Sequence, residues 1–156
     1  MKSSVSVQEA DFDLSAEVRA LTAGDHAAGA VASFVGLVRD NNDGTHVADM
    51  TLEHYPGMTE KALHEIVAQA GARWELLGVR VIHRVGHLMP GEQIVLVAVS
   101  SPHRGNAFAA CEFIMDYLKT QAPFWKKEST DGGSRWVDAR DSDDAALKKW
   151  SDEIGL

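Results

Sequence analysis

The sequence contains a single cysteine, Cys111, among its 156 residues. One cysteine excludes an intrachain disulfide, and it excludes every metal or redox motif that needs a pair of cysteines. Cys111 falls on the apolar stripe of a predicted helix. We therefore expect a packed, unreactive thiol rather than a nucleophile.

Long apolar runs and positive charge are also scarce. The first residues, MKSSVSVQEADFD, contain no hydrophobic signal core, and no apolar run approaches the roughly 20 residues that span a membrane. Fifteen Lys and Arg stand against 23 Asp and Glu, which gives a formal net charge of -8. A broad surface that follows nucleic-acid phosphates is not expected, although a small basic pocket is compatible with this balance. We expect a cytoplasmic protein with neither a nucleic-acid nor a membrane partner.

The signatures of several enzyme classes are missing. There is no GxGxxG and no Walker loop, so a nucleotide-binding fold has no support. Ser101 lies outside any GxSxG motif, which leaves a hydrolase triad without a basis. His83 and His87 are four residues apart but flank Gly86 in a strand-and-turn segment, so no metal site is expected. His83 and Arg84 could be active-site groups, but we favour their interpretation as a strand residue and its solvated neighbour.

The chain is long enough to form one domain, 1–156, with a sizeable core. Residue patterns predict strands at 5–8, 29–38, 49–55, 79–85, 94–100 and 135–139, and helices at 14–21, 59–74, 101–123 and 142–150. The polar segments 40–44 and 131–134 are predicted to be turns or loops. The strand at 94–100 is apolar enough to be central. This order predicts an α+β domain with a mixed or largely antiparallel sheet.

The candidate functional residues cluster at the two ends of the helix predicted at 101–123. Ser101 is expected to be its N-cap and Pro102 its first helical residue. Its apolar stripe is formed by Ala107, Phe108, Cys111, Ile114, Met115 and Leu118. Basic residues stand at its start, at its end and just beyond it. The plain alternative is that these cations only solvate the helix ends, because Lys and Arg near a C-terminus also favour the helix dipole.

The two basic ends of this helix are too far apart for one small ligand. Arg104 and Lys119 are fifteen residues apart, or about 22 Å along the axis at 1.5 Å per residue. If His103 and Arg104 serve the same site as Lys119, they most easily come from a second copy of the chain. The spacing therefore predicts a dimer with composite sites.

The distal end of the helix predicts a cationic pocket. Lys119, Lys126 and Lys127 flank the turn at Pro123, which could fold the ammonium groups toward each other. Two ammonium groups in a partly desolvated pocket disfavour each other's charge, so one becomes a usable proton donor, base or nucleophile. Arg39, at the end of a predicted strand, could join them as an anion clamp.

Five blocks of the sequence together resemble one enzyme family, the large catalytic subunits of molybdopterin synthase. They are FVGLVRD at 34–40, TLEHYPGMTEKAL at 51–63, VIHRVG at 81–86, HRGNAFAACEFIMDYLKTQAPFWKKE at 103–128 and RWVDAR at 135–140. The resemblance spans roughly 29–150. It implies an α/β hammerhead-type fold with a small additional β subdomain.

The resemblance also implies an assembly and a reaction. The assembly is a homodimer at the centre of a heterotetramer, with a small ubiquitin-like sulfur-carrier subunit at each end. The reaction transfers sulfur from the carrier's C-terminal Gly-Gly thiocarboxylate to cyclic pyranopterin monophosphate, and two transfers produce the dithiolene of molybdopterin. No cofactor is implied.

The positions that match the family's functional segments are implied site residues. Lys119 and Lys126 would be catalytic, in acid–base work and in stabilisation of an oxyanion. The substrate would be bound by Leu37, Val38, Arg39, His103, Arg104, Lys127, Glu128 and Arg140. The tunnel for the carrier's tail would be lined by Phe34, Met115 and Pro123.

Two other functions remain open from the residues alone. The first is a lysine-dependent lyase that uses Lys119 as a Schiff-base amine. The second is a non-enzymatic adaptor that binds a ubiquitin-like protein through apolar and basic surface.

Overall fold

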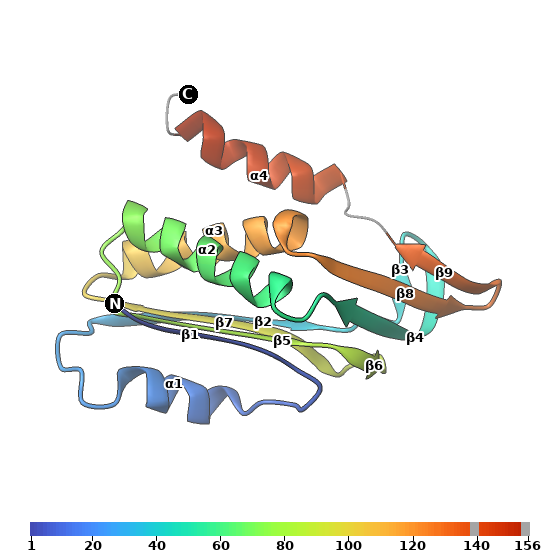
Figure 1. The fold of residues 1–156 in the computed structure, drawn as a ribbon, viewed down its shortest axis with the longest axis horizontal. Helices are drawn as coiled ribbons and strands as arrows, with labels where there is room; N and C mark the ends of the chain where they lie inside the picture. The colour runs from blue at the N-terminus through green and yellow to red at the C-terminus, as the bar shows by residue number, and fades with distance from the viewer. Residues whose placement is uncertain (138–140, 154–156) are drawn as a thin grey trace.

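A computed structural model describes residues 1–137 and 141–153, and in these residues two sheets are accompanied by four helices (Figure 1). The larger layer is a four-stranded sheet in the order β1 (Lys2–Gln8), β5 (Gly78–Arg84), β7 (Gln93–Ser101) and β2 (Ala30–Leu37). β1 is parallel to β5, whereas the β5–β7 and β7–β2 pairs are antiparallel. The mixed sheet confirms the predicted α+β class.

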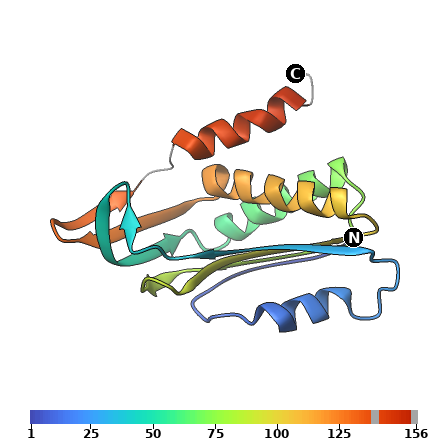
Figure 2. The ribbon, with the colours of Figure 1, turned by 180° about the vertical axis from the view of Figure 1, so that it is seen from behind.

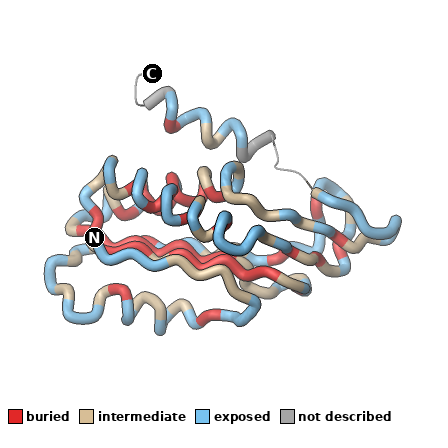
Figure 3. Tube along the Cα trace, viewed as in Figure 1, coloured by how far each residue is buried: buried red, intermediate tan, exposed pale blue. Residues whose placement is uncertain are grey.

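Helices cover both faces of this sheet. α2 (Met58–Arg73) and α3 (Arg104–Gln121) lie on one face, and α1 (Leu14–Thr22) lies on the other (Figure 1). Along β7, Val95, Val97 and Val99 pack toward α2 and α3, while Leu96 and Ala98 belong to the cluster beside α1. A strand that is covered on both faces is apolar throughout rather than alternating. The central place predicted for 94–100 is confirmed, and the inner strands form the buried band of Figure 3.

A second, antiparallel sheet projects from one end of the first. It contains β3 (Asn41–Asn42), β4 (Thr45–His54), β8 (Phe124–Thr130) and β9 (Gly133–Val137), and β6 (Gly86–Leu88) pairs with β4. The chain passes from β2 directly into the β3–β4 hairpin, which lies at this end (Figure 2). This sheet is an additional β unit, as the family resemblance implied.

The loop predicted at 40–44 is wrong in part, because it contains β3 and a tight hairpin turn. Asn41 pairs with His46 and Asn42 with Thr45, which leaves two residues in the turn. These residues, at positions 43 and 44, have φ of 52° and 81°, the left-handed backbone that two-residue hairpins of type I′ require. Asp-Gly is a preferred pair for that turn.

The predicted start of the long helix is also wrong. Ser101 is the last residue of β7, paired with Ala30, and its hydroxyl donates to the Glu75 carbonyl at 2.9 Å. The helix begins at Arg104 with His103 as N-cap, and His103 makes no side-chain capping bond. Strand pairing of Ser101 therefore overrides its tendency to cap.

The apolar stripe of α3 was predicted correctly except at one position. Phe108 is 66% exposed, and Ala110 and Phe113 are buried instead. The remaining predicted members, Ala107, Cys111, Ile114, Met115 and Leu118, are buried. Although α3 has 18 residues, no helix of the described chain is both long and apolar enough to cross a membrane.

α4 (Asp141–Glu153) packs outside α3, where Lys149 pairs with Glu112 at 2.6 Å and Trp150 makes the buried contacts (Figure 1). Trp150 is 4% exposed, and its indole Nε1 donates to the Asp116 carboxylate at 2.7 Å. Its ring meets Trp74 and Phe113 edge-on at centroid distances of 5.6 and 5.4 Å, and Arg73 lies over it at 5.4 Å. This single side chain supplies both apolar and polar contacts for docking the helix.

We expect Trp150→Ala to lower the free energy of unfolding by about 3 kcal/mol, the usual cost of truncating a buried aromatic side chain. Urea unfolding followed by circular dichroism measures the loss. Trp136→Ala is the matched control, because Trp136 is 59% exposed and should cost less than about 0.5 kcal/mol. Equal losses in the two variants would contradict this role for Trp150.

Candidate active site

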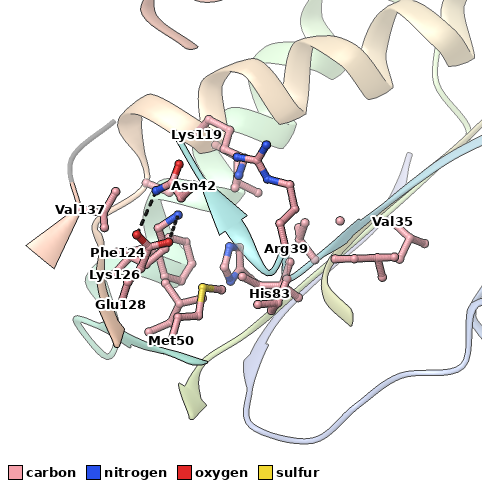
Figure 4. A pocket seen from close by; sticks show the side chains of 18 of the residues that line it. Val35, Arg39, Asn42, Met50, His83, Lys119, Phe124, Lys126, Glu128 and Val137 are labelled. Atoms are coloured by element: carbon pink, nitrogen blue, oxygen red, sulfur yellow. Dashed lines mark hydrogen bonds and ion pairs between the residues drawn. The ribbon is translucent and has the colours of Figure 1, made fainter. Parts of the chain in front are cut away.

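A cavity of about 520 Å³ opens where the two sheets meet, beside the C-terminal end of α3 (Figure 4). Eight elements contribute to its wall, namely β2, β3, β4, β5, β7, α3, β8 and β9, together with the residues that follow β2. Its lining includes Phe34, Leu37, Val38, Arg39, Asn42, Met50, His83, Lys119, Phe124, Lys126 and Glu128. A cavity of this size accommodates a small molecule.

The turn after α3 brings two lysines into one cavity. Lys119 lies in the last turn of the helix, β8 begins at Phe124, and both Lys119 and Lys126 contribute to the wall. Lys127 does not line the cavity, because successive side chains of a strand point to opposite faces. Its Nζ lies 5.8 Å from the ring centroid of Trp136 on the neighbouring strand.

Glu128 is a buried carboxylate held by three partners. The residue is 3% exposed, and its carboxylate accepts from Asn42 Nδ2 at 3.0 Å. Arg135 Nη2 also donates to it at 3.3 Å, and Lys126 Nζ lies 3.9 Å from its other oxygen. Burial of an unpaired carboxylate would be costly, so these contacts compensate for its loss of solvent and fix the side chain. Its carboxylate is thus already engaged by protein groups.

The interpretation of Arg84 as a solvated neighbour is wrong. Arg84 is 8% exposed and donates to the carbonyls of Gln93 at 2.8 Å and Glu9 at 3.1 Å. The N-terminal segment covers the end of β5, so even the charged residue Arg84 is buried there. His83 is buried as well, and it lines the cavity.

His83 is held as a neutral ring. It stacks on Phe124 with 3.9 Å between ring centroids, and its Nδ1 lies 2.8 Å from the Arg84 carbonyl oxygen. The pKa of His83 is lowered from 6.5 to about 4, chiefly by burial and in smaller part by electrostatic repulsion from Lys119 and His54, although the hydrogen bond with Arg84 acts in the opposite direction. Protonation would place a charge in a desolvated position beside other cations.

The depressed pKa of His83 predicts acid sensitivity. Between pH 6.5 and 4 the unfolded chain binds a proton at this histidine that the folded chain does not bind. The free energy of unfolding should therefore fall by on the order of 3 kcal/mol as the pH is lowered through that window. Urea unfolding at a series of pH values should show a shallower slope for His83→Phe than for the unaltered chain. His64→Gln, at an exposed position of α2, should leave the slope unchanged, and the account is wrong if His83→Phe also leaves it unchanged.

The basic residues at the other end of α3 lie apart from this cavity. His103 and Arg104 are exposed and do not line it. Arg104 and Lys119 belong to one uninterrupted helix, so about 22 Å separates them along its axis. One copy of the chain therefore brings Lys119, but not Arg104, to the cavity.

Of the remaining predicted site residues, some line the cavity and others do not. Phe34 lines the cavity, whereas Met115 and Pro123 do not, and Met115 is buried in the main core. Arg140 lies outside the described residues.

Cys111 is buried, its Sγ lies 3.7 Å from the Val97 carbonyl oxygen, and burial raises its pKa to about 11. A thiol in this setting is unreactive, as its place on the helix predicted.

Sequence reasoning did not assign four wall residues to the site, namely Asn42, Met50, His83 and Phe124. The Asp-Gly pair after Asn42 is a hairpin signal that could have placed it in a strand facing the second sheet. His83 carries no comparable local signal, because it is buried by residues distant in the sequence: Phe124 stacks on its ring and Val7 pairs with it between β1 and β5.

The wall combines cationic and apolar character. The described wall contains three basic residues, Arg39, Lys119 and Lys126, but only one carboxylate, that of Glu128. Arg135 already pairs with this carboxylate. Ammonium and guanidinium groups in a partly enclosed site bind phosphate or carboxylate and stabilise oxyanions. Phe34 and Leu37, which are 42% and 56% exposed, add apolar surface. Such a wall is suited to an anionic small molecule and to acyl-type chemistry.

Comparisons with known proteins agree on one family. The family model described as MoaE protein matches residues 7–121. The molybdopterin synthase catalytic subunit of Ralstonia nicotianae is 67% identical over 146 residues, which are 94% of this chain and 83% of that protein. The corresponding subunit of Vibrio cholerae is 62% identical over 94% of this chain and 97% of its own length. A solved molybdopterin biosynthesis MoaE protein from Burkholderia ambifaria MC40-6 is 59% identical, with a TM-score of 0.83 over 97% of this chain and 99% of that one.

Proposed function

The chain belongs to the MoaE protein family, and from this premise we propose that its cavity passes sulfur from a carrier's C-terminal thiocarboxylate to cyclic pyranopterin monophosphate. Like its relatives, the chain is the catalytic subunit of a molybdopterin synthase, a sulfur-transferring enzyme of molybdenum cofactor biosynthesis. The observation that carries the proposed site is the meeting of Lys119 and Lys126 in one cavity. We place the enzyme in the cytoplasm.

The two lysines provide the chemistry that a thiocarboxylate requires. The thiocarboxylate sulfur bonds to a substrate carbon and displaces an oxygen substituent, so that the sulfur is held between the substrate and the acyl carbon of the carrier. Water then attacks that acyl carbon and produces a tetrahedral intermediate whose oxygen carries negative charge. Its collapse breaks the bond between the acyl carbon and sulfur, releases the carrier as a carboxylate and leaves the sulfur on the substrate. An ammonium group fixed beside that oxygen stabilises it more in the transition state than in the ground state. A second lysine can give or take the proton that moves in the same step. Glu128 lies 3.9 Å from Lys126, and we assign it the positioning of that ammonium.

Arg39 and the apolar mouth provide the binding groups. Arg39 lines the cavity with Leu37 and Val38, and we assign its guanidinium to the phosphate of the substrate. The exposed ring of Phe34 is assigned to the narrow carrier tail, which ends in Gly-Gly and can pass between side chains. Sulfur therefore arrives from a partner, and the unreactive setting of Cys111 is consistent with that route.

The proposed assembly is a homodimer with one carrier at each end, hence a heterotetramer. α3 separates Lys119 from His103 and Arg104 by about 22 Å, so the two basic groups serve one substrate only if two copies contribute. β2 is an edge strand, and it carries the partly exposed apolar side chains Val31, Phe34 and Leu37. A second copy that covers part of this edge would bury them.

Reconstitution tests the proposed function. The chain is incubated with cyclic pyranopterin monophosphate and a carrier whose C-terminus has been converted to the thiocarboxylate, and molybdopterin is detected after oxidation to a fluorescent derivative. Product is expected with this carrier, and none with the same carrier ending in a carboxylate. Trapping of carbonyl compounds on Lys119 by borohydride, without any molybdopterin, would favour the lyase instead.

A further inference from the structure

His83 is the cavity residue for which the transfer chemistry gives no role. His83 is 6% exposed, and its ring stacks on Phe124. It belongs to β5, which lies between β1 and β7 in the main sheet. The ring plane is therefore fixed by the fold. In Figure 4 it lies between Arg39, Phe124 and Met50 in the wall of the cavity.

The hydrogen bond to Arg84 fixes which ring nitrogen carries the proton. The partner of Nδ1 is a backbone carbonyl oxygen at 2.8 Å, and a carbonyl can only accept. Nδ1 must therefore carry the hydrogen, and in the neutral ring Nε2 presents a lone pair. Among the described residues, no group hydrogen-bonds to Nε2.

The surroundings keep this nitrogen an acceptor. His83 is enclosed, and Lys119 and His54 act electrostatically against its protonation, so the ring stays neutral near pH 7. Nε2 thus differs from every other nitrogen of the described wall side chains, because those of Arg39, Lys119, Lys126 and Asn42 are donors.

Among the described residues, Asn42 carries another acceptor without a partner, but it is buried behind the wall. Its Nδ2 must face Glu128, because the carboxylate only accepts, and its Oδ1 is turned to the other side (Figure 4). This Oδ1 is buried, and within the described chain it has no hydrogen-bond partner. Because Asn42 Oδ1 is buried, His83 Nε2 is the acceptor that the described wall leaves open to an N–H group, while the cations are available to an anionic group.

We propose that His83 is a specificity-determining residue, whose Nε2 accepts a hydrogen bond from a ring or amino N–H of the substrate. The ligand class that fits is a nitrogen heterocycle with N–H donors and a phosphate, in which the cations hold the phosphate and His83 selects the donor edge. This inference rests on the proposed function, because it concerns recognition of the same substrate. An analogue with an acceptor in place of that N–H would meet the lone pair of Nε2 and be rejected.

Two amide substitutions separate recognition from structure. In His83→Asn the amide nitrogen can occupy the place of Nδ1 and keep the Arg84 bond, but nothing replaces Nε2. In His83→Gln the longer side chain can place its amide oxygen near Nε2, but the bond to Arg84 is lost. Both variants lose the stacked ring, so they form a matched pair.

Calorimetric titration of the full chain with cyclic pyranopterin monophosphate gives the binding readout, and steady-state assays give KM and kcat. We expect His83→Asn to raise both Kd and KM about tenfold, the usual effect of leaving one buried donor unpaired, whereas His83→Gln should stay within about threefold of the unaltered chain. Thermal unfolding of each variant verifies that it is folded at the assay temperature.

The outcomes are distinguishable. A weaker Asn variant beside a near-normal Gln variant supports the inference. Equal affinity in all three proteins, or a Gln variant weaker than the Asn variant, overturns it and leaves the proposed function standing, because the unaltered chain still forms product. If the unaltered chain neither binds nor converts the substrate, the proposed function itself fails and the inference fails with it.

Discussion

Replacement of Lys119 by alanine is expected to lower kcat by about 100-fold or more, because removal of an oxyanion-stabilising or proton-transferring group usually costs at least that much. Lys119 is exposed at the end of α3, so its truncation should leave the unfolding midpoint close to that of the unaltered chain. Product formation at saturating carrier and substrate is the measurement.

The matched control is Lys61→Ala, which removes an exposed lysine from α2 outside the cavity wall. Its turnover should be unchanged. Calorimetric titration with the carrier should show that Lys119→Ala still binds it. Turnover in Lys119→Ala within about threefold of the unaltered chain would falsify the catalytic assignment, and with intact carrier binding it would favour the adaptor.

A mixture of Arg104→Ala and Lys119→Ala chains should recover about a quarter of the unaltered activity, although each variant alone is nearly inactive. If each site takes Lys119 from one copy and Arg104 from the other, a mixed dimer contains one intact site and one doubly impaired site. Random exchange places half of all dimers in the mixed form, and a two-fold symmetric dimer has two sites. Activity after co-refolding of equal amounts is the measurement.

A second mixture serves as the control for the first. Lys119 and Lys126 line the same cavity of one copy, so a mixed dimer of Lys119→Ala and Lys126→Ala contains no intact site. This mixture should stay inactive. If the Arg104→Ala and Lys119→Ala mixture also stays inactive while mixed dimers are detected by native mass spectrometry, the composite site is wrong.

The regular elements were predictable where local pattern and final burial coincide. The run 94–100 is apolar on both faces because β7 is covered by α1 on one side and by α2 and α3 on the other. The spacing of Arg104 and Lys119 on one helix, and the turn that returns Lys126 toward Lys119, also followed from local geometry.

The features that sequence reasoning missed depend on distant partners. Burial alternates only weakly along β8, and its strand form comes from pairing with β4, at least seventy residues earlier in the chain. Ser101 carries a sound capping signal, but pairing with Ala30 keeps it in a strand. Arg84 and His83 are sealed by the N-terminal segment and by Phe124, which no local pattern encodes.

The most direct test of sulfur transfer through the lysine cavity follows the sulfur atom itself. A carrier labelled with a heavy sulfur isotope in its thiocarboxylate is mixed with the chain and with cyclic pyranopterin monophosphate, and product and protein are analysed by mass spectrometry. We predict two labelled sulfurs in each molybdopterin, no label on Cys111, and no labelled product with Lys119→Ala. Label retained on Cys111, or labelled product formed at an undiminished rate by Lys119→Ala, would contradict the account.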